Sequence, residues 1–366
     1  MQAALFCPAP YAGRVSRPGW PVPVTDYAAE VAEDSMAWAL EQASMADELG
    51  FDWVSVAEHH YAPMSLTPNP MVMAGALTQR VRRAKIALLG SNIPIQNPVR
   101  VAEEFAMLDT LTGGRIVAGM LRGTSNEYVT YGVNPAESRE RFVEALHLII
   151  RAWTEPEPFG WVGRYYEYRT ISIWPRPVQQ PYPPIFMSIS SPEMAELAAR
   201  HRINAGFAVT SVPLAKGSAD LYRAAARQAG WEVGSERILY RVPVHLAASD
   251  EEAFDDLTQA TAPRGGGRYS SSNRAVDEAV ARSGYYGRDE AHQRGRVAMG
   301  GDLRARVDDG RILVGSPKRV IDQIRTIHDE LGAGIIEVIP ASPTRDQARR
   351  TLELFGAEVL PGIRPW

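Results

Sequence analysis

The stretch "IALLGSNIPIQNPVRVAEEFAMLDTLTGGRIVAGML", residues 86–121, sets the pattern from which the fold follows. It opens with a short apolar run, continues with a segment of helical spacing and closes with a second apolar run. In the middle segment Val101, Phe105 and Leu108 fall on one stripe, which predicts a helix with one buried face over 98–111. The order strand, helix, strand is typical of a parallel α/β fold.

The same alternation extends in both directions along the chain. Short runs rich in β-branched residues recur, and segments with helical spacing separate them. We expect strands at 3–7, 53–57, 86–91, 116–121, 185–189, 205–209, 238–246 and 335–339. About eight strands favour a closed barrel over an open sheet. The sequence therefore predicts an α/β fold of the TIM (β/α)8 barrel type, with residues 1–366 as one domain.

Three segments interrupt the alternation. Residues 8–25 are rich in proline and glycine and follow the first expected strand. Residues 154–184 carry many prolines and aromatic side chains, which predicts an extended insertion. Residues 263–310 are polar, glycine-rich and loosely patterned, and they lie between the seventh and eighth expected strands. We expect this last insertion to be a long lid loop.

Composition and charge narrow the choice of partners. The formal net charge is −4, the isoelectric point is near 6.0 and no block of lysine and arginine is present, so no nucleic-acid partner is expected. No apolar stretch approaches the roughly 18 residues of a membrane helix, and the first residues lack the pattern of a signal peptide. The single cysteine, Cys7, cannot form an internal disulfide. We therefore expect a cytoplasmic protein without a membrane partner.

Three side chains that can hold protons follow the second expected strand. Glu58, His59 and His60 lie in "AEHHYAP" directly after it. In a parallel barrel the carboxyl ends of the strands carry the active site. A neutral histidine accepts a proton near neutral pH, and a carboxylate beside it orients the ring. Catalysis and a structural histidine that caps the strand end both remain open, whereas no metal site is expected because no further ligand cluster occurs.

Two further strand ends suit an anion. Arg122 and Gly123 follow the fourth expected strand, where a guanidinium offers paired donors and glycine lets the backbone approach. Ser190 and Ser191 stand between the fifth strand and a helix, whose first N–H groups bind anions. A surface ion pair is the alternative for the arginine. Together the two strand ends suggest one bound phosphate. The stretch "LVGSPKRV" at 313–320 has a similar serine and proline before a helix, but it is interpreted as an ordinary helix start.

These blocks resemble the bacterial luciferase-like flavin-dependent monooxygenase family. The likeness rests on "GFDWVSVAEHH", "NPVRVAEEFAMLDTLTGGRIVAGMLRG", "NPAESRERFVEAL", "WPRPVQQPYPPIFMSISSPE" and "LVGSPKRVIDQI", which occur in the family's order and cover nearly the whole chain. The resemblance implies a TIM barrel, and reduced FMN as cosubstrate supplied by a separate flavin reductase. It further implies a two-component monooxygenase that uses dioxygen, through a flavin peroxide, to oxygenate a hydrophobic or carbonyl-containing small molecule.

The resemblance also assigns roles to residues at the strand ends. His59 matches the family's active-site acid or base, with His60 in a supporting role and Glu58 beside them. The positions that match flavin-binding residues are Ser91 and Asn92 against the ring, Met120 and Leu121 beneath it, and Arg122, Ser190 and Ser191 at the phosphate. These residues come from four different strand ends, as expected for a site at the mouth of a barrel.

One position departs from luciferase itself. Luciferase has a reactive cysteine just before the phosphate-binding arginine, and this chain has Leu121 there. Oxygenation without light emission is therefore expected. The resemblance also implies a homodimer formed through the helices that follow the second and third strands. Two alternatives remain open: a deazaflavin-dependent enzyme of the same fold that transfers hydride, and a non-catalytic flavin-binding protein.

Overall fold

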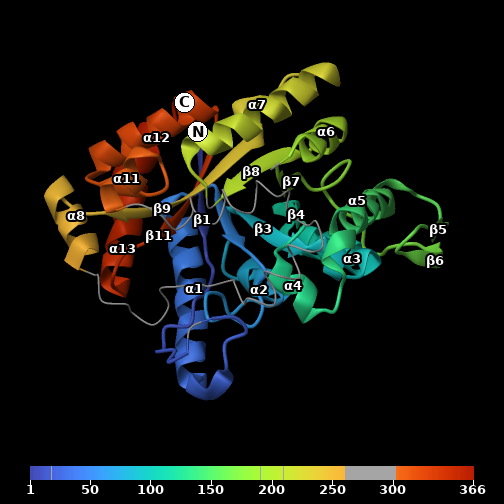
Figure 1. The fold of residues 1–366 in the computed structure, drawn as a ribbon, viewed down its shortest axis with the longest axis horizontal. Helices are drawn as coiled ribbons and strands as arrows, with labels where there is room; N and C mark the ends of the chain where they lie inside the picture. The colour runs from blue at the N-terminus through green and yellow to red at the C-terminus, as the bar shows by residue number, and fades with distance from the viewer. Residues whose placement is uncertain (18, 190, 209, 260–301) are drawn as a thin grey trace.

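Eight parallel strands close into a barrel (Figure 1). The computed structural model describes residues 1–366 except 18, 190, 209 and 260–301. Around the barrel the strands follow the order β1-β2-β3-β4-β7-β8-β9-β11, and β11 pairs with β1 to complete the ring. The predicted TIM barrel is confirmed. The strands are β1 (Gln2–Phe6), β2 (Trp53–Val56), β3 (Lys85–Asn92), β4 (Ile116–Leu121), β7 (Ile185–Ser188), β8 (Asn204–Ala208), β9 (Ile238–Leu246) and β11 (Ile335–Pro340).

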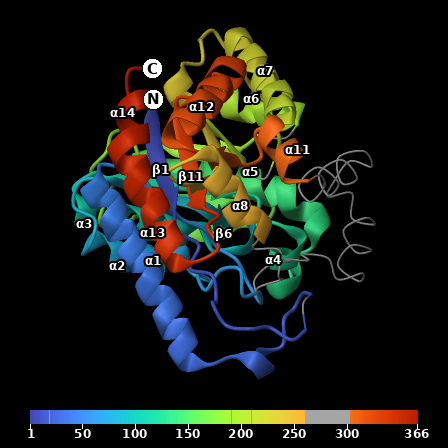
Figure 2. The same ribbon diagram turned by 90° about the vertical axis from the view of Figure 1, so that its left-hand side faces the viewer.

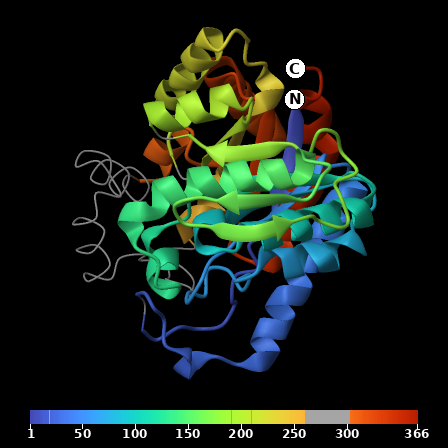
Figure 3. The ribbon, with the colours of Figure 1, turned by 90° about the vertical axis from the view of Figure 1, so that its right-hand side faces the viewer.

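The helices cover the outside of the barrel, as Figures 2 and 3 show from two sides. Most of them pack an apolar face against the sheet, and one large core lies between the two layers, whereas α4 and α8 contribute to separate small clusters. The predicted helix over 98–111 is α3 (Pro98–Thr112), which Asn97 caps and Gly113 ends with a positive φ of 64°. The other main helices are α1 (Ala29–Leu49), α2 (Pro70–Thr78), α4 (Ser125–Thr130), α5 (Ser138–Thr154), α6 (Pro192–Arg200), α7 (Val212–Gln228), α8 (Asp250–Gln259), α12 (Pro317–Leu331), α13 (Arg345–Leu354) and α14 (Leu360–Ile363).

A short strand that the sequence analysis did not identify lies beside β9. This strand, β10 (Leu313–Gly315), pairs in parallel with the carboxyl half of β9, while β8 pairs with its amino half. Three residues are too few to show any periodicity, which is why the pattern went unrecognised. The predicted helix start that follows is confirmed, because the Ser316 side chain accepts from the backbone of Arg319 and Pro317 opens α12.

The insertion at 154–184 forms a two-stranded antiparallel hairpin, β5 (Phe159–Val162) and β6 (Glu167–Ile171). The hairpin stands apart from the barrel at the end of α5 (Figure 1). The chain's return to β7 is held by Asp109 of α3, whose Oδ2 accepts the N–H groups of Val178 at 2.8 Å and Gln179 at 2.9 Å. The predicted extended insertion is therefore confirmed and is tied to the barrel by a buried carboxylate.

The expected lid loop at 263–310 falls mostly outside the described residues. Its described part, 302–310, contains the short helix α11 (Leu303–Asp308). Among the helices that the structure describes, none is long and apolar enough to cross a membrane.

The amino-terminal half of the barrel lumen is filled by side chains. A buried cluster consists of strand residues alone, which identifies it as the barrel interior: Ala4, Trp53, Ala87, Leu89, Val117, Phe186, Leu239 and Ile335. Side chains two positions further along each strand face the same way. At that level Phe6, Ser55 and Glu337 are buried, whereas Ser188 of β7 and Ala208 of β8 are exposed, so the lumen is open to solvent on the side of β7 and β8.

Candidate active site

The first polar group at the mouth of the lumen is Glu58, directly after β2. Its Oε1 lies 2.9 Å from Nε2 of His60, and both side chains are buried. Its Oε2 accepts the backbone N–H of Asn92 at 3.0 Å and the side-chain amide of Gln96 at 2.6 Å. Glu58 therefore joins the ends of β2 and β3, and it orients His60 rather than His59.

His59 has a different carboxylate partner, Glu127 of α4. His59 Nδ1 lies 3.4 Å from Glu127 Oε1, with 28% of the histidine side chain exposed and only 2% of the glutamate. The backbone N–H of Thr124 donates to Glu127 Oε2 at 2.8 Å, and the Thr124 hydroxyl donates to the same oxygen. Burial acts to raise the pKa of Glu127, but the hydrogen bonds and charge of His59 and the bonds from Thr124 outweigh it, so that pKa lies below its ordinary value. An ionised carboxylate thus orients a ring that remains partly exposed.

The sequence analysis missed Glu127, although one local signal was present. The run "TSNE" at 124–127 has the spacing of a capping box, in which a threonine and a glutamate cap a helix reciprocally. That motif predicts a helix start after β4, at the same end of the barrel as His59. The pairing of the two side chains depends on how α4 folds back toward β2, which local sequence does not specify.

At the end of β3, the predicted pair Ser91 and Asn92 is buried. The β3 register shifts between Leu89 and Ser91, a β-bulge opposite β4. Within the described residues, the Ser91 Oγ has no hydrogen-bond partner. Asn92 pairs in register with Leu121 of β4, and the half-buried Leu121 is accessible from the lumen. The neighbouring Met120 is fully buried in the core outside the sheet, so only one of the two residues expected beneath a flavin ring is available there.

The segment after β4 places Arg122 next to a close backbone approach. Gly123 has a φ of 84°, and a Cβ at this position would lie 3.1 Å from the Asn92 side chain. The hydroxyl of Tyr128, one turn into α4, donates to the Arg122 carbonyl. The Arg122 carbonyl is thus tied to α4, and the next residue, Gly123, lies close to Asn92 at the end of β3.

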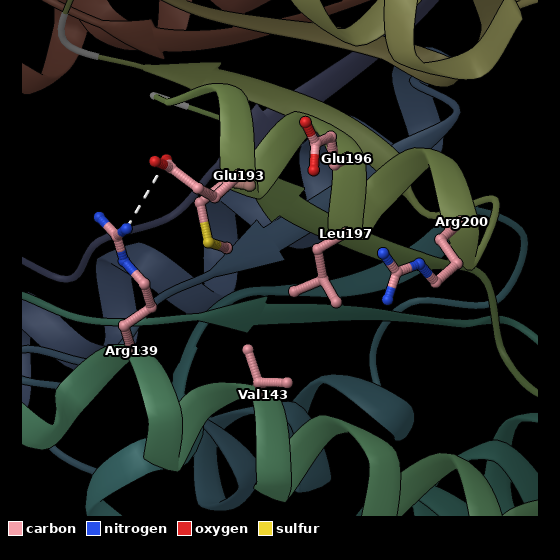
Figure 4. Close-up of a pocket in the computed structure, with 7 residues that line it drawn as sticks. Arg139, Val143, Glu193, Glu196, Leu197 and Arg200 are labelled. Carbon is pink, nitrogen blue, oxygen red and sulfur yellow. Dashed lines mark ion pairs between the residues drawn. The ribbon is translucent and has the colours of Figure 1, made fainter. Parts of the chain in front are cut away.

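The start of α6 is the second predicted anion-binding feature. Ser190 lies outside the described residues, and Ser191 caps α6 by accepting the N–H of Met194 at 3.4 Å. Hydrogen bonds from the Ser191 hydroxyl and from its own backbone N–H lower the pKa of Glu193. Arg139 of α5 points toward Glu193, with 3.6 Å between Nη1 and Oε2 (Figure 4). Because β4 and β7 are paired neighbours, the segments carrying Arg122 and Ser191 leave the barrel side by side.

Aromatic side chains that the sequence analysis did not single out form one rim of the site. Tyr131 stands edge-on to His60, with ring centroids 5.0 Å apart, and Tyr61 stacks on Trp20 at 5.9 Å. The Trp20 indole N–H donates to the His60 carbonyl at 2.9 Å, which fastens the 8–25 segment to the end of β2. Burial, and secondarily the charge of Glu58, raise the pKa of Tyr131, which therefore keeps its proton at neutral pH.

Within the part of the chain that the structure describes, no three His, Cys, Asp or Glu side chains gather closely enough to hold a metal ion.

Comparison with known proteins places this arrangement in a family. Residues 1–333 match the family model described as luciferase-like monooxygenase. The chain belongs to the luciferase-like monooxygenase family. It is accordingly a flavin-dependent monooxygenase, and the predicted family is confirmed.

A relative and two solved structures illustrate the likeness. The 4-hydroxyprotoasukamycin monooxygenase of Streptomyces nodosus subsp. asukaensis is 28% identical over 337 residues, which cover 88% of this chain and 85% of that protein. The crystal structure of monooxygenase RslO1 from Streptomyces bottropensis is 25% identical, covers 99% of both chains and superposes with a TM-score of 0.78. The oxygenating constituent of 3,6-diketocamphane monooxygenase from Pseudomonas putida, solved in complex with FMN, shares the fold at 23% identity, 99% and 98% coverage and a TM-score of 0.74.

Proposed function

We propose that this protein is the oxygenase of a two-component system that uses reduced FMN and dioxygen to oxygenate a hydrophobic or carbonyl-containing small molecule. The observation that supports the proposal is that His59 with its partner Glu127, Asn92, Arg122 and Ser191 all follow or end strands at the same, carboxyl-terminal end of the barrel. A partner flavin reductase supplies the reduced FMN, and a cytoplasmic location follows from that supply.

The residues present fit FMN. Arg122 offers charge and paired donors for a phosphate, Gly123 leaves the backbone uncovered beside it, and the first N–H groups of α6 lie on the neighbouring segment. Glu193 brings a negative charge to the same helix end, and its ion pair with Arg139 offsets that charge. Asn92 and Leu121, paired at the ends of β3 and β4, would contact the flavin ring.

When bound, reduced FMN supplies the electrons with which dioxygen is activated. The chain's own contribution is proton control and partial shielding from water. His59 holds or delivers a proton at an imidazole nitrogen that faces the lumen, while Glu127 keeps the ring oriented through Nδ1. Glu58 and His60 fix the ends of β2 and β3, and the rim of Trp20, Tyr61 and Tyr131 shields one side of the mouth.

The phosphate assignment is tested by comparing FMN with riboflavin, which lacks the phosphate. Replacing Arg122 by alanine removes a charge-assisted contact, so we expect the Kd for FMN to rise about tenfold or more and the Kd for riboflavin to change little. Equilibrium titration followed by flavin fluorescence measures both. The control Arg100→Ala removes an exposed arginine of α3 that pairs with Glu104, and it should alter neither affinity. Equal weakening of FMN and riboflavin in Arg122→Ala would remove the arginine from the phosphate site.

A further inference from the structure

A charged pair lies inside the barrel, away from the residues assigned to flavin and proton transfer. Arg241 of β9 and Glu337 of β11 pair in register, and each is two positions beyond a residue of the buried interior cluster, so both face the lumen. Arg241 Nε forms an ion pair with Glu337 Oε2, and the Ser55 hydroxyl donates to Glu337 Oε1. The glutamate side chain is 0% exposed and the arginine 13% exposed.

The guanidinium of Arg241 is held in one orientation. Glu337 binds its Nε edge, and the ring of Phe6 lies against its face, with 3.7 Å between the Arg241 Cζ and the ring centroid. Among the residues that the structure describes, neither terminal nitrogen of Arg241 has a hydrogen-bond partner. A buried pair of this kind is weak evidence for stability, because apolar side chains often replace such pairs without loss.

The solvent-exposed side of the lumen, formed by β7 and β8, lies next to this guanidinium. Ala208 of β8 pairs in register with Arg241 and is exposed, and Gly206 and Ser188 continue the accessible surface toward β7. The next lumen-facing residue of β9 is the half-buried Pro243. A small molecule that reaches this exposed wall of β7 and β8 therefore meets the terminal nitrogens of Arg241, which keep N–H groups to donate.

From this geometry we infer that Arg241 is a substrate-recognition residue, which binds the carbonyl or phenol oxygen of an otherwise apolar compound. The charge of Arg241 is already balanced by Glu337, so a neutral oxygen acceptor completes its hydrogen bonds without adding an unpaired charge. A carboxylate would leave one negative charge uncompensated inside the barrel. The inference deepens the proposed function and rests on it, since the bound compound is taken to be the one that is oxygenated.

The test uses three probes of similar shape on the full chain: p-nitrophenol at a pH where it is un-ionised, p-nitrotoluene, and p-nitrobenzoate. Isothermal titration calorimetry gives each Kd. We expect the wild-type protein to bind p-nitrophenol about tenfold more tightly than p-nitrotoluene, and more tightly than p-nitrobenzoate. The Glu337→Gln variant keeps both donor groups and should keep the preference for the phenol.

Removing the arginine alone would leave Glu337 buried and unpaired, so the decisive variant is the double replacement Arg241→Met/Glu337→Gln. Circular dichroism and a thermal melt establish that it is folded. We expect it to bind p-nitrophenol and p-nitrotoluene equally, while Arg164→Met, which removes an exposed arginine paired with Glu140, behaves as wild type.

Several outcomes would overturn the inference: no binding of p-nitrophenol, equal wild-type affinity for phenol and toluene, tightest binding of the benzoate, or a phenol preference that survives in the double variant. FMN is titrated into the same preparations. FMN binding without a phenol preference contradicts this inference alone. A preference that depends on Arg241 without any FMN binding supports the recognition role and contradicts the proposed cofactor.

Discussion

In the pair of His59 and Glu127, one side chain is partly exposed and the other is buried and charged. The glutamate is buried and ionised, whereas the histidine keeps more than a quarter of its side chain exposed. A buried carboxylate that fixes a ring nitrogen leaves the other nitrogen free to exchange a proton. His60, by contrast, is buried against Glu58 and has a supporting position.

We predict that His59→Gln keeps its affinity for reduced FMN and loses about a hundredfold in oxygenation rate, because general acid or base catalysis is removed while the phosphate contacts remain. The rate is measured with a flavin reductase and a panel of ketones and phenols, with products identified by mass spectrometry. Glu127→Gln should retain part of the activity and change its pH dependence, since the ring keeps a hydrogen-bonding neighbour but loses the charge. Wild-type turnover in His59→Gln would exclude this histidine from the reaction.

Much of the site was predictable at the scale of single residues, but the pairing between residues was not. Glu58, His59, Asn92 and Arg122 could be placed because each lies at or shortly after the end of a strand, and strand ends meet at the mouth of a barrel. The partner of His59 could not, since the contact with Glu127 joins residues 68 positions apart.

Among the secondary-structure elements, the paired strands β3 and β4 determine where Asn92 and Gly123 lie. Gly119 of β4 lies so close to β3 that a Cβ there would come 2.4 Å from the Leu88 carbonyl oxygen, and the bulge that follows in β3 carries Asn92 to its place beside Gly123. The two strands and the helix between them were predictable because apolar runs and a helical stripe alternate clearly. The bulge was not, since it depends on the spacing between two strands.

A second contact between elements joins α5 to the end of α6. His147 Nε2 lies 3.0 Å from His201 Nε2. Burial and the charge of Arg200 lower the pKa of His147, and burial, His147 and Arg200 lower the pKa of His201. The native state therefore favours two neutral rings that share one hydrogen bond.

We predict that this pair makes stability fall in mild acid. Both native pKa values lie below the ordinary histidine value of 6.5, so the unfolded chain takes up protons first as the pH drops. The stabilising contribution is present above that value and is lost as the pH falls through the lower native values. Urea unfolding at a series of pH values should show a flatter dependence for His147→Gln/His201→Gln than for the wild type. Parallel curves for the two proteins would contradict the assignment.

On the scale of the whole molecule, one outer face carries apolar side chains that the barrel does not bury. Val72 of α2 with Met107 and Leu111 of α3 are exposed, and the two helices pack side by side. We keep the prediction of a homodimer through these helices. Light scattering should give the mass of a dimer for the wild type and of a monomer for Val72→Glu/Met107→Glu.

The control for the dimer prediction is Leu221→Glu. Leu221 is also an exposed leucine, but it belongs to α7, which lies away from α2 and α3 (Figure 2). This variant should remain dimeric. A monomeric wild-type protein, or a dimer that persists in the double variant, would contradict the assignment of this face.

The fold as a whole followed from the sequence more fully than its insertions did. Eight alternations of strand and helix predict a barrel, because closure of the sheet pairs every strand edge. Each of these strands is also long enough to be recognised in the sequence. The hairpin at 154–184 and the strand β10 follow no such repeat, and their positions depend on single contacts such as Asp109 with the backbone of Val178. That residues 1–366 fold as one domain remains a proposal.

The central claim is that this lumen binds reduced FMN and controls its reaction with dioxygen. The most direct measurement is an anaerobic titration of the protein with reduced FMN, followed by rapid mixing with dioxygen while the flavin absorbance is recorded. Our account predicts saturable binding and reoxidation that is slower than that of free reduced FMN, because protein groups replace bulk water around much of the bound flavin. Absence of binding, or reoxidation at the rate of free flavin, would contradict it.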